Sequence, residues 1–234
     1  MGVSDKNYVS EDLMLGGFKI YQSPSLYRFT SDAVVLSRFA QGGARRVIDL
    51  CSGSGIVALH YFALRNGEGI EKVTLCELQE PLAEMSGESV KINGLERIFT
   101  VRNQPLQTLI EKDEYDLVLC NPPYKKRGSG IKLSNEHLDI CRNETAVTLG
   151  EIVEKAESLL VRGGKFCLCN AVDRLIETIV LFEKHKLYPS RLRFVAAREG
   201  KDPYLFLIEG IKGKKSNLVV ESQAINDAKD FSGE

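Results

Sequence analysis

The sequence predicts an α/β protein with a doubly wound, mostly parallel sheet of seven strands and a terminal antiparallel hairpin. Apolar runs of strand length alternate with segments of helical period along most of the 234 residues. Such β-α-β alternation favours a parallel sheet with helices on both faces. The last two strand-like runs have no helical segment between them. We therefore expect a final hairpin that adds an antiparallel edge strand.

The expected strands are short apolar runs bounded by turn or polar residues. The run at residues 115–120 is nearly all apolar, so we expect it to be buried on both faces of the sheet. In chain order, strands are expected at residues 46–51, 72–77, 98–102, 115–120, 165–170, 191–196 and 204–209.

Helical period and end signals predict the helices between these strands. Pro81 suits a first helical position, and Asn93-Gly94 suits a helix end. Gly163-Gly164 ends the helix before the fifth strand. Helices are expected at residues 33–39, 56–65, 81–92, 148–161 and 174–185.

Charge and hydropathy exclude a polycationic nucleic-acid-binding protein and a membrane-spanning protein. With 31 Lys and Arg against 32 Asp and Glu, the chain is not a polycation that binds nucleic acid by bulk charge. The longest uncharged run, residues 50–64, is too short and too rich in glycine to span a bilayer. We expect residues 1–45 to be an extension on the cofactor and substrate side, residues 46–215 the core domain, and residues 216–234 a flexible acidic tail.

Cysteine and histidine usage indicates a reduced, cytosolic protein without a metal site. The six cysteines form no C-x-x-C pair, and only three histidines are present. The N-terminus has no basic segment followed by an apolar core, so no secretory signal is expected.

The first motif, D-L-C-S-G-S-G-I-V-A, runs from Asp49 to Ala58 across a strand end and a helix start. Gly53 and Gly55 allow a positive φ and a close approach of the backbone to a ligand. The helix start adds N–H groups for an anionic group. The pattern also fits G-x-G-x-x-A, so a dinucleotide site remains an alternative, as does a tight turn without a ligand.

Two carboxylates indicate that the ligand is a nucleoside other than NAD. Asp49 lies inside the strand end, where it suits an ammonium group better than a pyrophosphate. Glu77 ends the second strand, where a carboxylate can accept both hydroxyls of a ribose. A ligand with an amino acid at one end and a nucleoside at the other, such as S-adenosylmethionine, satisfies both.

The second motif, Asn-Pro-Pro-Tyr, follows the fourth strand directly as Asn121 to Tyr124. The two prolines have no N–H and hold the backbone extended, so the segment presents fixed oxygen acceptors suited to an –NH₂ group. Tyr124 adds a flat face for a planar group. If the first and fourth strands are neighbours, this motif faces the glycine turn.

Together these motifs resemble the class I S-adenosylmethionine-dependent methyltransferases that modify an exocyclic or amide nitrogen. The narrower resemblance is to the bacterial tRNA (adenine-N6)-methyltransferases that modify valine tRNA next to the anticodon. It spans residues 11–214 and includes E-D-L-M-L-G-G-F-K-I-Y-Q, F-T-S-D-A-V-V-L, C-R-N-E and R-L-R-F-V. It implies a Rossmann-like fold, S-adenosylmethionine as the cofactor and tRNA as the partner in the cytoplasm.

The resemblance also implies roles for individual residues. Asn103 stands where relatives carry an acidic residue that binds the adenine amino group, and Asp32 has the alternative role of an ordinary helix N-cap. The residues implied in cofactor binding are Thr30, Asp32, Asp49, Cys51, Gly53, Gly55, Glu77 and Asn103.

On the acceptor side the resemblance implies direct methyl transfer to an unpaired adenine. Asn121 and the Pro122 carbonyl would hold the N6–H groups, while Tyr124 would stack on the flipped base. Basic residues follow this motif and suit phosphate contacts: Lys125, Lys126, Arg127 and Arg142. A solvated charged face is the alternative for such a run.

Three other functions stay open from the sequence. The first is a protein glutamine-N5 methyltransferase, although 45 residues are few for the N-terminal domain that those enzymes carry. The second is a DNA adenine or rRNA guanine-N2 methyltransferase. The third is a non-catalytic RNA-binding module, against which the intact glycine and Asn-Pro-Pro-Tyr motifs argue.

Overall fold

The computed structural model describes residues 8–26, 28–124, 144 and 146–226. Its strands are β1 (Val9–Asp12), β2 (Lys19–Gln22), β3 (Arg46–Leu50), β4 (Lys72–Glu77), β5 (Phe99–Asn103), β6 (Tyr115–Cys120), β7 (Leu160–Ala171), β8 (Leu187–Ala196), β9 (Leu205–Lys212), β10 (Val219–Val220) and β11 (Ala224–Ile225). Its helices are α1 (Ser31–Phe39), α2 (Ile56–Ala63), α3 (Glu80–Ile92), α5 (Leu149–Leu159) and α6 (Leu175–Lys184), with short 3₁₀ turns at Leu106–Thr108 and Val172–Arg174.

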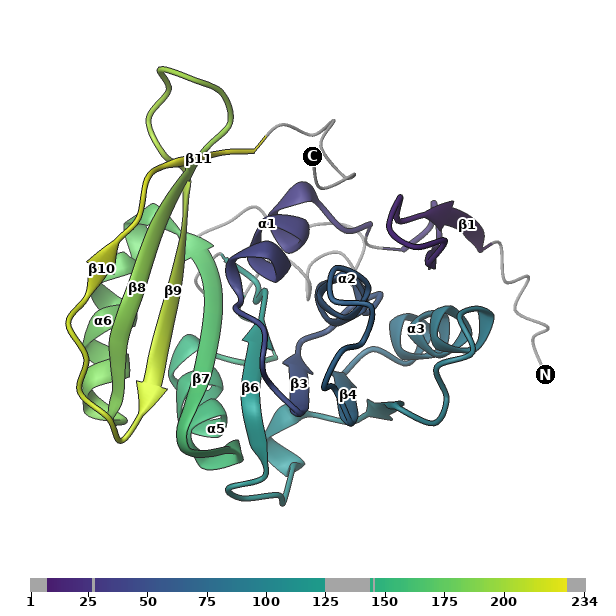
Figure 1. Cartoon of the computed structure of the whole chain (residues 1–234), viewed down its shortest axis with the longest axis horizontal. Coiled ribbons are helices and arrows are strands. Elements are labelled where there is room, and N and C mark those ends of the chain that lie inside the picture. Colours follow the sequence, from purple (N-terminus) through teal and green to yellow (C-terminus); the bar gives the residue numbers. More distant parts are fainter. Residues whose placement is uncertain (1–7, 27, 125–143, 145, 227–234) are drawn as a thin grey trace.

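The central sheet confirms the predicted doubly wound α/β class. In the described part of the chain its order is β10-β8-β9-β7-β6-β3-β4-β5, with β11 also paired to β8 (Figure 1). Strands β5, β4, β3, β6 and β7 are mutually parallel, and β9 runs antiparallel to both of its neighbours. Strand order reverses between β3 and β6, which are hydrogen-bonded to each other. This is the point where open α/β sheets bind ligands.

Successive core residues of a strand point to opposite faces of the sheet, so they belong alternately to two separate hydrophobic layers. Val47 packs in the layer that contains α1, α2 and α3, whereas its neighbour Ile48 packs with α5 and α6. Leu117 and Val118 divide between the same two layers. The chain therefore buries both faces of its parallel strands, as the apolar run at residues 115–120 predicted.

The position of the antiparallel strand corrects one expectation. We expected the final hairpin to place it at the sheet edge, but β9 lies between β7 and β8. Its residues 205–208 are all apolar and fully buried, so this strand has the composition of a sheet interior. The hairpin folds back into the sheet, so that β8 is the outer of its two strands.

The C-terminal segment also differs from expectation. Residues 219–225 form β10 and β11 on the outer edge of β8, where we expected a flexible acidic tail. The Glu221 carboxylate lies 2.6 Å from Nε of Arg191 and also pairs with Arg193. These ion pairs and the strand pairing hold the segment on the sheet. Residues 227–234 lie outside the described part.

The N-terminal extension contains a hairpin that periodicity did not predict. Strands β1 and β2 pair antiparallel, and β2 packs on α3, where the backbone N–H of Lys19 donates to Asn93 Oδ1 at 2.8 Å. The N–H of Tyr21 donates to Ser89 Oγ at 2.9 Å. After this hairpin the chain crosses to α1, which covers the sheet near β7 (Figure 1).

No helix in the described ranges is both long enough and apolar enough to cross a membrane.

Candidate functional site

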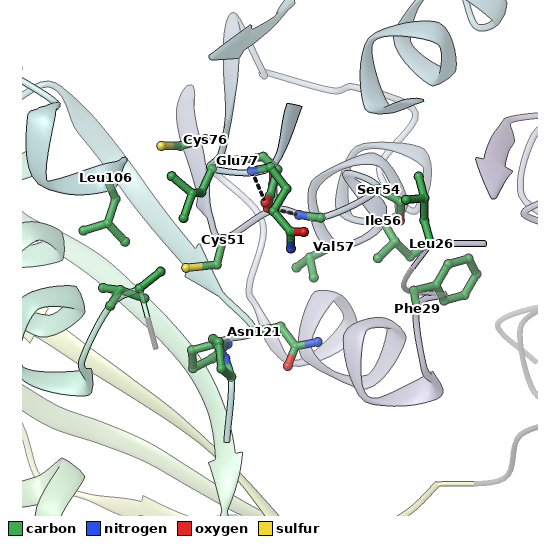
Figure 2. Close-up of a pocket in the computed structure, with 18 of the residues that line it drawn as sticks. Leu26, Phe29, Cys51, Ser54, Ile56, Val57, Cys76, Glu77, Leu106 and Asn121 are labelled. Atoms are coloured by element: carbon green, nitrogen blue, oxygen red, sulfur yellow. Dashed lines mark hydrogen bonds between the residues drawn. The ribbon is translucent and has the colours of Figure 1, made fainter. Parts of the chain in front are cut away.

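A cavity of about 570 Å³ lies at the carboxyl ends of β3, β4 and β6, beside the strand-order reversal. Figure 2 shows side chains from these strand ends around it. Eight predicted residues line it: Thr30, Asp32, Cys51, Gly53, Glu77, Asn121, Pro122 and Tyr124. Three others lie outside its lining: Asp49, Gly55 and Asn103.

The glycine turn has the strained backbone that its composition predicted. Gly53 and Gly55 have φ values of 55° and 81°, in the region that favours glycine. A Cβ on Gly55 would lie 2.9 Å from Leu75 Cδ1, whereas one on Gly53 would meet no atom within 4 Å. Gly55 therefore allows close packing of α2, and Gly53 leaves its backbone open to the cavity. Cys51 shares the left-handed conformation with φ of 56°, which the sequence did not indicate.

Glu77 is tied to this turn by its side chain. Its carboxylate accepts hydrogen bonds from the backbone N–H of Gly53 at 2.8 Å and of Gln79 at 2.9 Å (Figure 2). Burial raises the pKa of Glu77, and these two bonds oppose that shift only in part. The cavity thus has a buried carboxylate at its wall whose position is set by the backbone of two strand ends.

Asp49 lies behind the turn and not on the cavity wall. Its side chain is fully buried, and one carboxylate oxygen accepts from the Ala58 N–H at 3.3 Å. Among the residues that the structure describes, none forms a hydrogen bond with the other oxygen. Burial raises the pKa of Asp49 well above its ordinary value, and the nearby Glu77 carboxylate adds to the shift. A buried acceptor of this kind is costly unless a donor reaches it.

Asn103 also has a different place from the one we expected. Its side-chain amide donates to the carbonyls of Glu77 at 3.0 Å and Leu78 at 2.9 Å, so it braces the end of β4. The next residue, Gln104, lines the cavity. Consecutive residues of an extended segment point to opposite sides, which explains why one of the two faces the cavity.

The acceptor motif carries a hydrogen-bond network centred on Asn121. Its side-chain oxygen accepts from the Tyr124 hydroxyl at 2.6 Å and from the Cys169 thiol at 2.9 Å. Burial raises the pKa of Cys169, so this thiol keeps its proton and donates. The sequence did not single out Cys169, because strand β7 brings it beside β6 only in the folded sheet.

Asp32 joins this network from the N-terminal side. Its Oδ1 accepts from the Tyr204 hydroxyl at 2.6 Å and from Asn226 Nδ2 at 2.9 Å. Its Oδ2 accepts from Thr30 Oγ1 at 3.2 Å and lies 3.5 Å from the Tyr124 hydroxyl. Tyr204 and Asn226 are 172 and 194 residues from Asp32 in sequence, so no local pattern points to them.

A buried arginine supports the backbone of the same motif. Arg174 is 2% exposed and donates to Glu144 Oε1 at 2.8 Å and to the Tyr124 carbonyl at 3.4 Å. Its other nitrogens bond the carboxylate of Glu177. The predicted substrate-binding residues Lys125, Lys126, Arg127 and Arg142 lie outside the described residues.

The cavity fits a ligand such as S-adenosylmethionine. The Glu77 carboxylate suits ribose hydroxyls, and the exposed Gly53 backbone suits a close approach. Apolar residues of the lining, Leu78 and Leu106 among them, suit a purine ring. Within the described residues, no group of three or more His, Cys, Asp or Glu is arranged to hold a metal ion.

Comparison with known proteins identifies relatives of this chain. A family model described as methyltransferase small domain matches residues 30–184. The tRNA1(Val) (adenine(37)-N6)-methyltransferase of Tolumonas auensis is 27% identical, over 82% of this chain and 79% of that protein. The protein of the same name from Flavobacterium johnsoniae is 27% identical, over 89% and 88%.

Solved structures share the fold. A predicted O-methyltransferase from Agrobacterium tumefaciens superposes with a TM-score of 0.62 at 20% identity, covering 83% of this chain and 86% of its own. TYW2 of P. horikoshii, solved in complex with MeSAdo, gives a TM-score of 0.62 at 12% identity, with 90% and 73% covered.

Proposed function

The chain belongs to the methyltransferase small domain family, and on that premise we propose that it methylates the exocyclic N6 of an unpaired adenine in the anticodon loop of valine tRNA. It is a methyltransferase that takes its methyl group from S-adenosylmethionine. The names of the two curated relatives support the choice of adenine and tRNA. The observation that carries the proposal is the Asn121 side-chain oxygen at the cavity, next to two prolines that supply no N–H.

We assign the cofactor to the glycine-turn side of the cavity. Glu77 would accept the ribose hydroxyls, and the turn at Cys51 and Gly53 would approach the methionine and ribose region. Thr30 and Asp32 would reach the cofactor from the N-terminal side. Bound there, S-adenosylmethionine supplies an electrophilic methyl group.

The acceptor residues prepare the nitrogen for attack. An adenine N6 is a weak nucleophile because its lone pair is delocalised into the ring. Asn121 Oδ1 and the Pro122 carbonyl would accept the two N–H bonds, favour a pyramidal nitrogen and aim it at the methyl carbon. The N6 lone pair would form the new N–C bond while the S–C bond breaks and leaves its electron pair on sulfur, and N6 would then release one proton to solvent.

The nucleic acid would be held by stacking and by phosphate contacts. The Tyr124 ring would stack on the flipped base, which returns about 1–3 kcal/mol of the unstacking cost. We propose that Lys125, Lys126, Arg127 and Arg142 contact phosphates next to that base. Because tRNA is the proposed substrate, we also propose that the enzyme works in the cytoplasm.

The test is a comparison of tRNA from cells with and without this protein. Mass spectrometry should show one N6-methyladenine missing from valine tRNA in the deletion strain. The purified protein with labelled methyl donor should restore it and should leave bulk rRNA, DNA and protein unlabelled. Unchanged tRNA together with an unmethylated glutamine in a cellular protein would favour the glutamine-N5 alternative.

A further inference from the structure

The oxygen that we propose to hold the substrate nitrogen already has two donors. Asn121 Oδ1 accepts from the Tyr124 hydroxyl at 2.6 Å and from the Cys169 thiol at 2.9 Å. An amide oxygen has two lone pairs, so both acceptor positions are filled. An incoming N–H must therefore displace one of these two donors before it can bind.

The Tyr124 hydroxyl has a second acceptor nearby on the cavity wall. This hydroxyl lies 3.5 Å from Asp32 Oδ2. A hydroxyl hydrogen moves between two acceptors by rotation about the C–O bond, so only a small shift of the ring is needed. The Cys169 thiol is fully buried in β7, and the second polar atom recorded near its sulfur is the Tyr124 hydroxyl itself, at 3.4 Å.

The carboxylate of Asp32 is held so that one oxygen faces Tyr124. Its Oδ1 is taken by the Tyr204 hydroxyl at 2.6 Å and by Asn226 Nδ2 at 2.9 Å. Its Oδ2 has Thr30 at 3.2 Å and is the oxygen nearest to Tyr124. The Asp32 oxygen nearest to Tyr124 is thus the one that the Tyr204 hydroxyl and Asn226 leave open.

The end of strand β8 positions Tyr204 and Asn226, the two donors to Asp32 Oδ1. The backbone N–H of Tyr204 donates to the Val195 carbonyl at 3.0 Å, and that of Asn226 donates to the Ala196 carbonyl at 2.8 Å. Asn226 follows β11 directly. Two segments that pair with one strand end thus converge on Asp32, and the C-terminal segment becomes part of the acceptor site.

We propose that Asp32 takes over the Tyr124 hydroxyl when the substrate nitrogen binds Asn121, and that Tyr204 and Asn226 are positioning residues that hold Asp32 for this exchange. This inference rests on the proposed role of Asn121 in binding the acceptor nitrogen. It makes the C-terminal segment, through Asn226, a determinant of turnover.

The test is a double-mutant cycle between Asn226 and Tyr124. Asn226→Ala should lower kcat about tenfold, the loss expected for one hydrogen bond to a charged group. Its cofactor dissociation constant, measured by calorimetry, should change less than about twofold. In a Tyr124→Phe background there is no hydroxyl to transfer, so adding Asn226→Ala should lower kcat by less than about twofold. Tyr204→Phe should repeat this pattern.

Asn217→Ala is the matched control, because Asn217 is an exposed asparagine of the same C-terminal segment. It should match the parent in both backgrounds. A tenfold loss from Asn226→Ala that persists in Tyr124→Phe would overturn the exchange and leave Asn226 with a structural role only. If the parent enzyme methylates a glutamine amide in place of adenine, the proposed function fails, and the same cycle on that amide still decides the exchange.

Discussion

The glycine-turn part of the cofactor side, from Asp49 to Gln79, is one stretch of chain, whereas the acceptor side is assembled from segments up to 194 residues apart. On the cofactor side, the Glu77 carboxylate binds backbone N–H groups 24 and 2 residues away. On the acceptor side, Asn121 and Asp32 are linked through side chains of Tyr124 and Tyr204. Backbone contacts within one β-α-β unit place the first site, and tertiary pairing of distant strands places the second.

This difference predicts how the two sides respond to mutation. Changes on the cofactor side should act on the affinity for S-adenosylmethionine, because its residues face that ligand. Changes on the acceptor side should act on turnover, because its residues face the substrate nitrogen. A residue that moved both quantities equally would break the comparison.

The largest effect is expected at Asn121. Asn121→Ala removes a preorganised acceptor that would contact only the substrate nitrogen, so kcat should fall by roughly 10²–10³. The cofactor dissociation constant should change less than about twofold, as checked by calorimetry. Asn217→Ala, at an exposed site, is the control. Near-normal turnover of Asn121→Ala would move the acceptor site elsewhere in the cavity.

A smaller effect, on the other quantity, is expected at Glu77. Glu77→Gln keeps the size of the side chain but removes one oxygen acceptor and the charge, so cofactor affinity should fall about tenfold to a hundredfold. The kcat at saturating cofactor should stay within about threefold. Glu80→Gln changes an exposed carboxylate at the start of α3 and should leave both constants unaltered. A large fall in kcat without loss of affinity would place Glu77 on the acceptor side.

The same comparison explains what the sequence could predict. The sequence order of strands and helices and the left-handed glycines at Gly53 and Gly55 follow from local patterns. The Asn-Pro-Pro-Tyr segment was found because its chemistry is contained in four consecutive residues. These features depend on neighbours in sequence, which is the information that periodicity and motifs carry.

The features that were missed depend on pairing between distant segments. The placement of β9 inside the sheet is a matter of strand order, which a hairpin pattern leaves open. Asn103 and Gln104 differ by one residue, and that offset reverses which of them faces the cavity. The attachment of the C-terminal segment depends on Glu221 meeting Arg191, 30 residues earlier in the chain. Acidic composition alone suggested a flexible tail there.

The smallest effect, on stability, is expected at Asp49. One oxygen of its buried carboxylate has no hydrogen-bond partner in the described part of the chain, and burial raises its pKa well above the ordinary value. A carboxyl group whose pKa is raised by folding binds its proton more tightly in the folded state than in the unfolded chain. It therefore supports folding most when protonated, and that support is lost as pH rises through the raised pKa.

Asp49→Asn removes this pH dependence while it keeps an oxygen for the Ala58 N–H. Without cofactor, the melting temperature of the variant minus that of wild type should increase as pH rises from about 4 to 7. Each kcal/mol of unfolding free energy that wild type loses over this range should add roughly 2–4 °C to the difference. Glu96→Gln, at an exposed carboxylate, is the matched control. Saturating cofactor should reduce the difference if its ammonium group supplies the missing partner of Asp49. A difference that is constant with pH would mean that folding does not raise the Asp49 pKa, because the carboxyl group would then bind its proton equally well in the folded protein and in the unfolded chain.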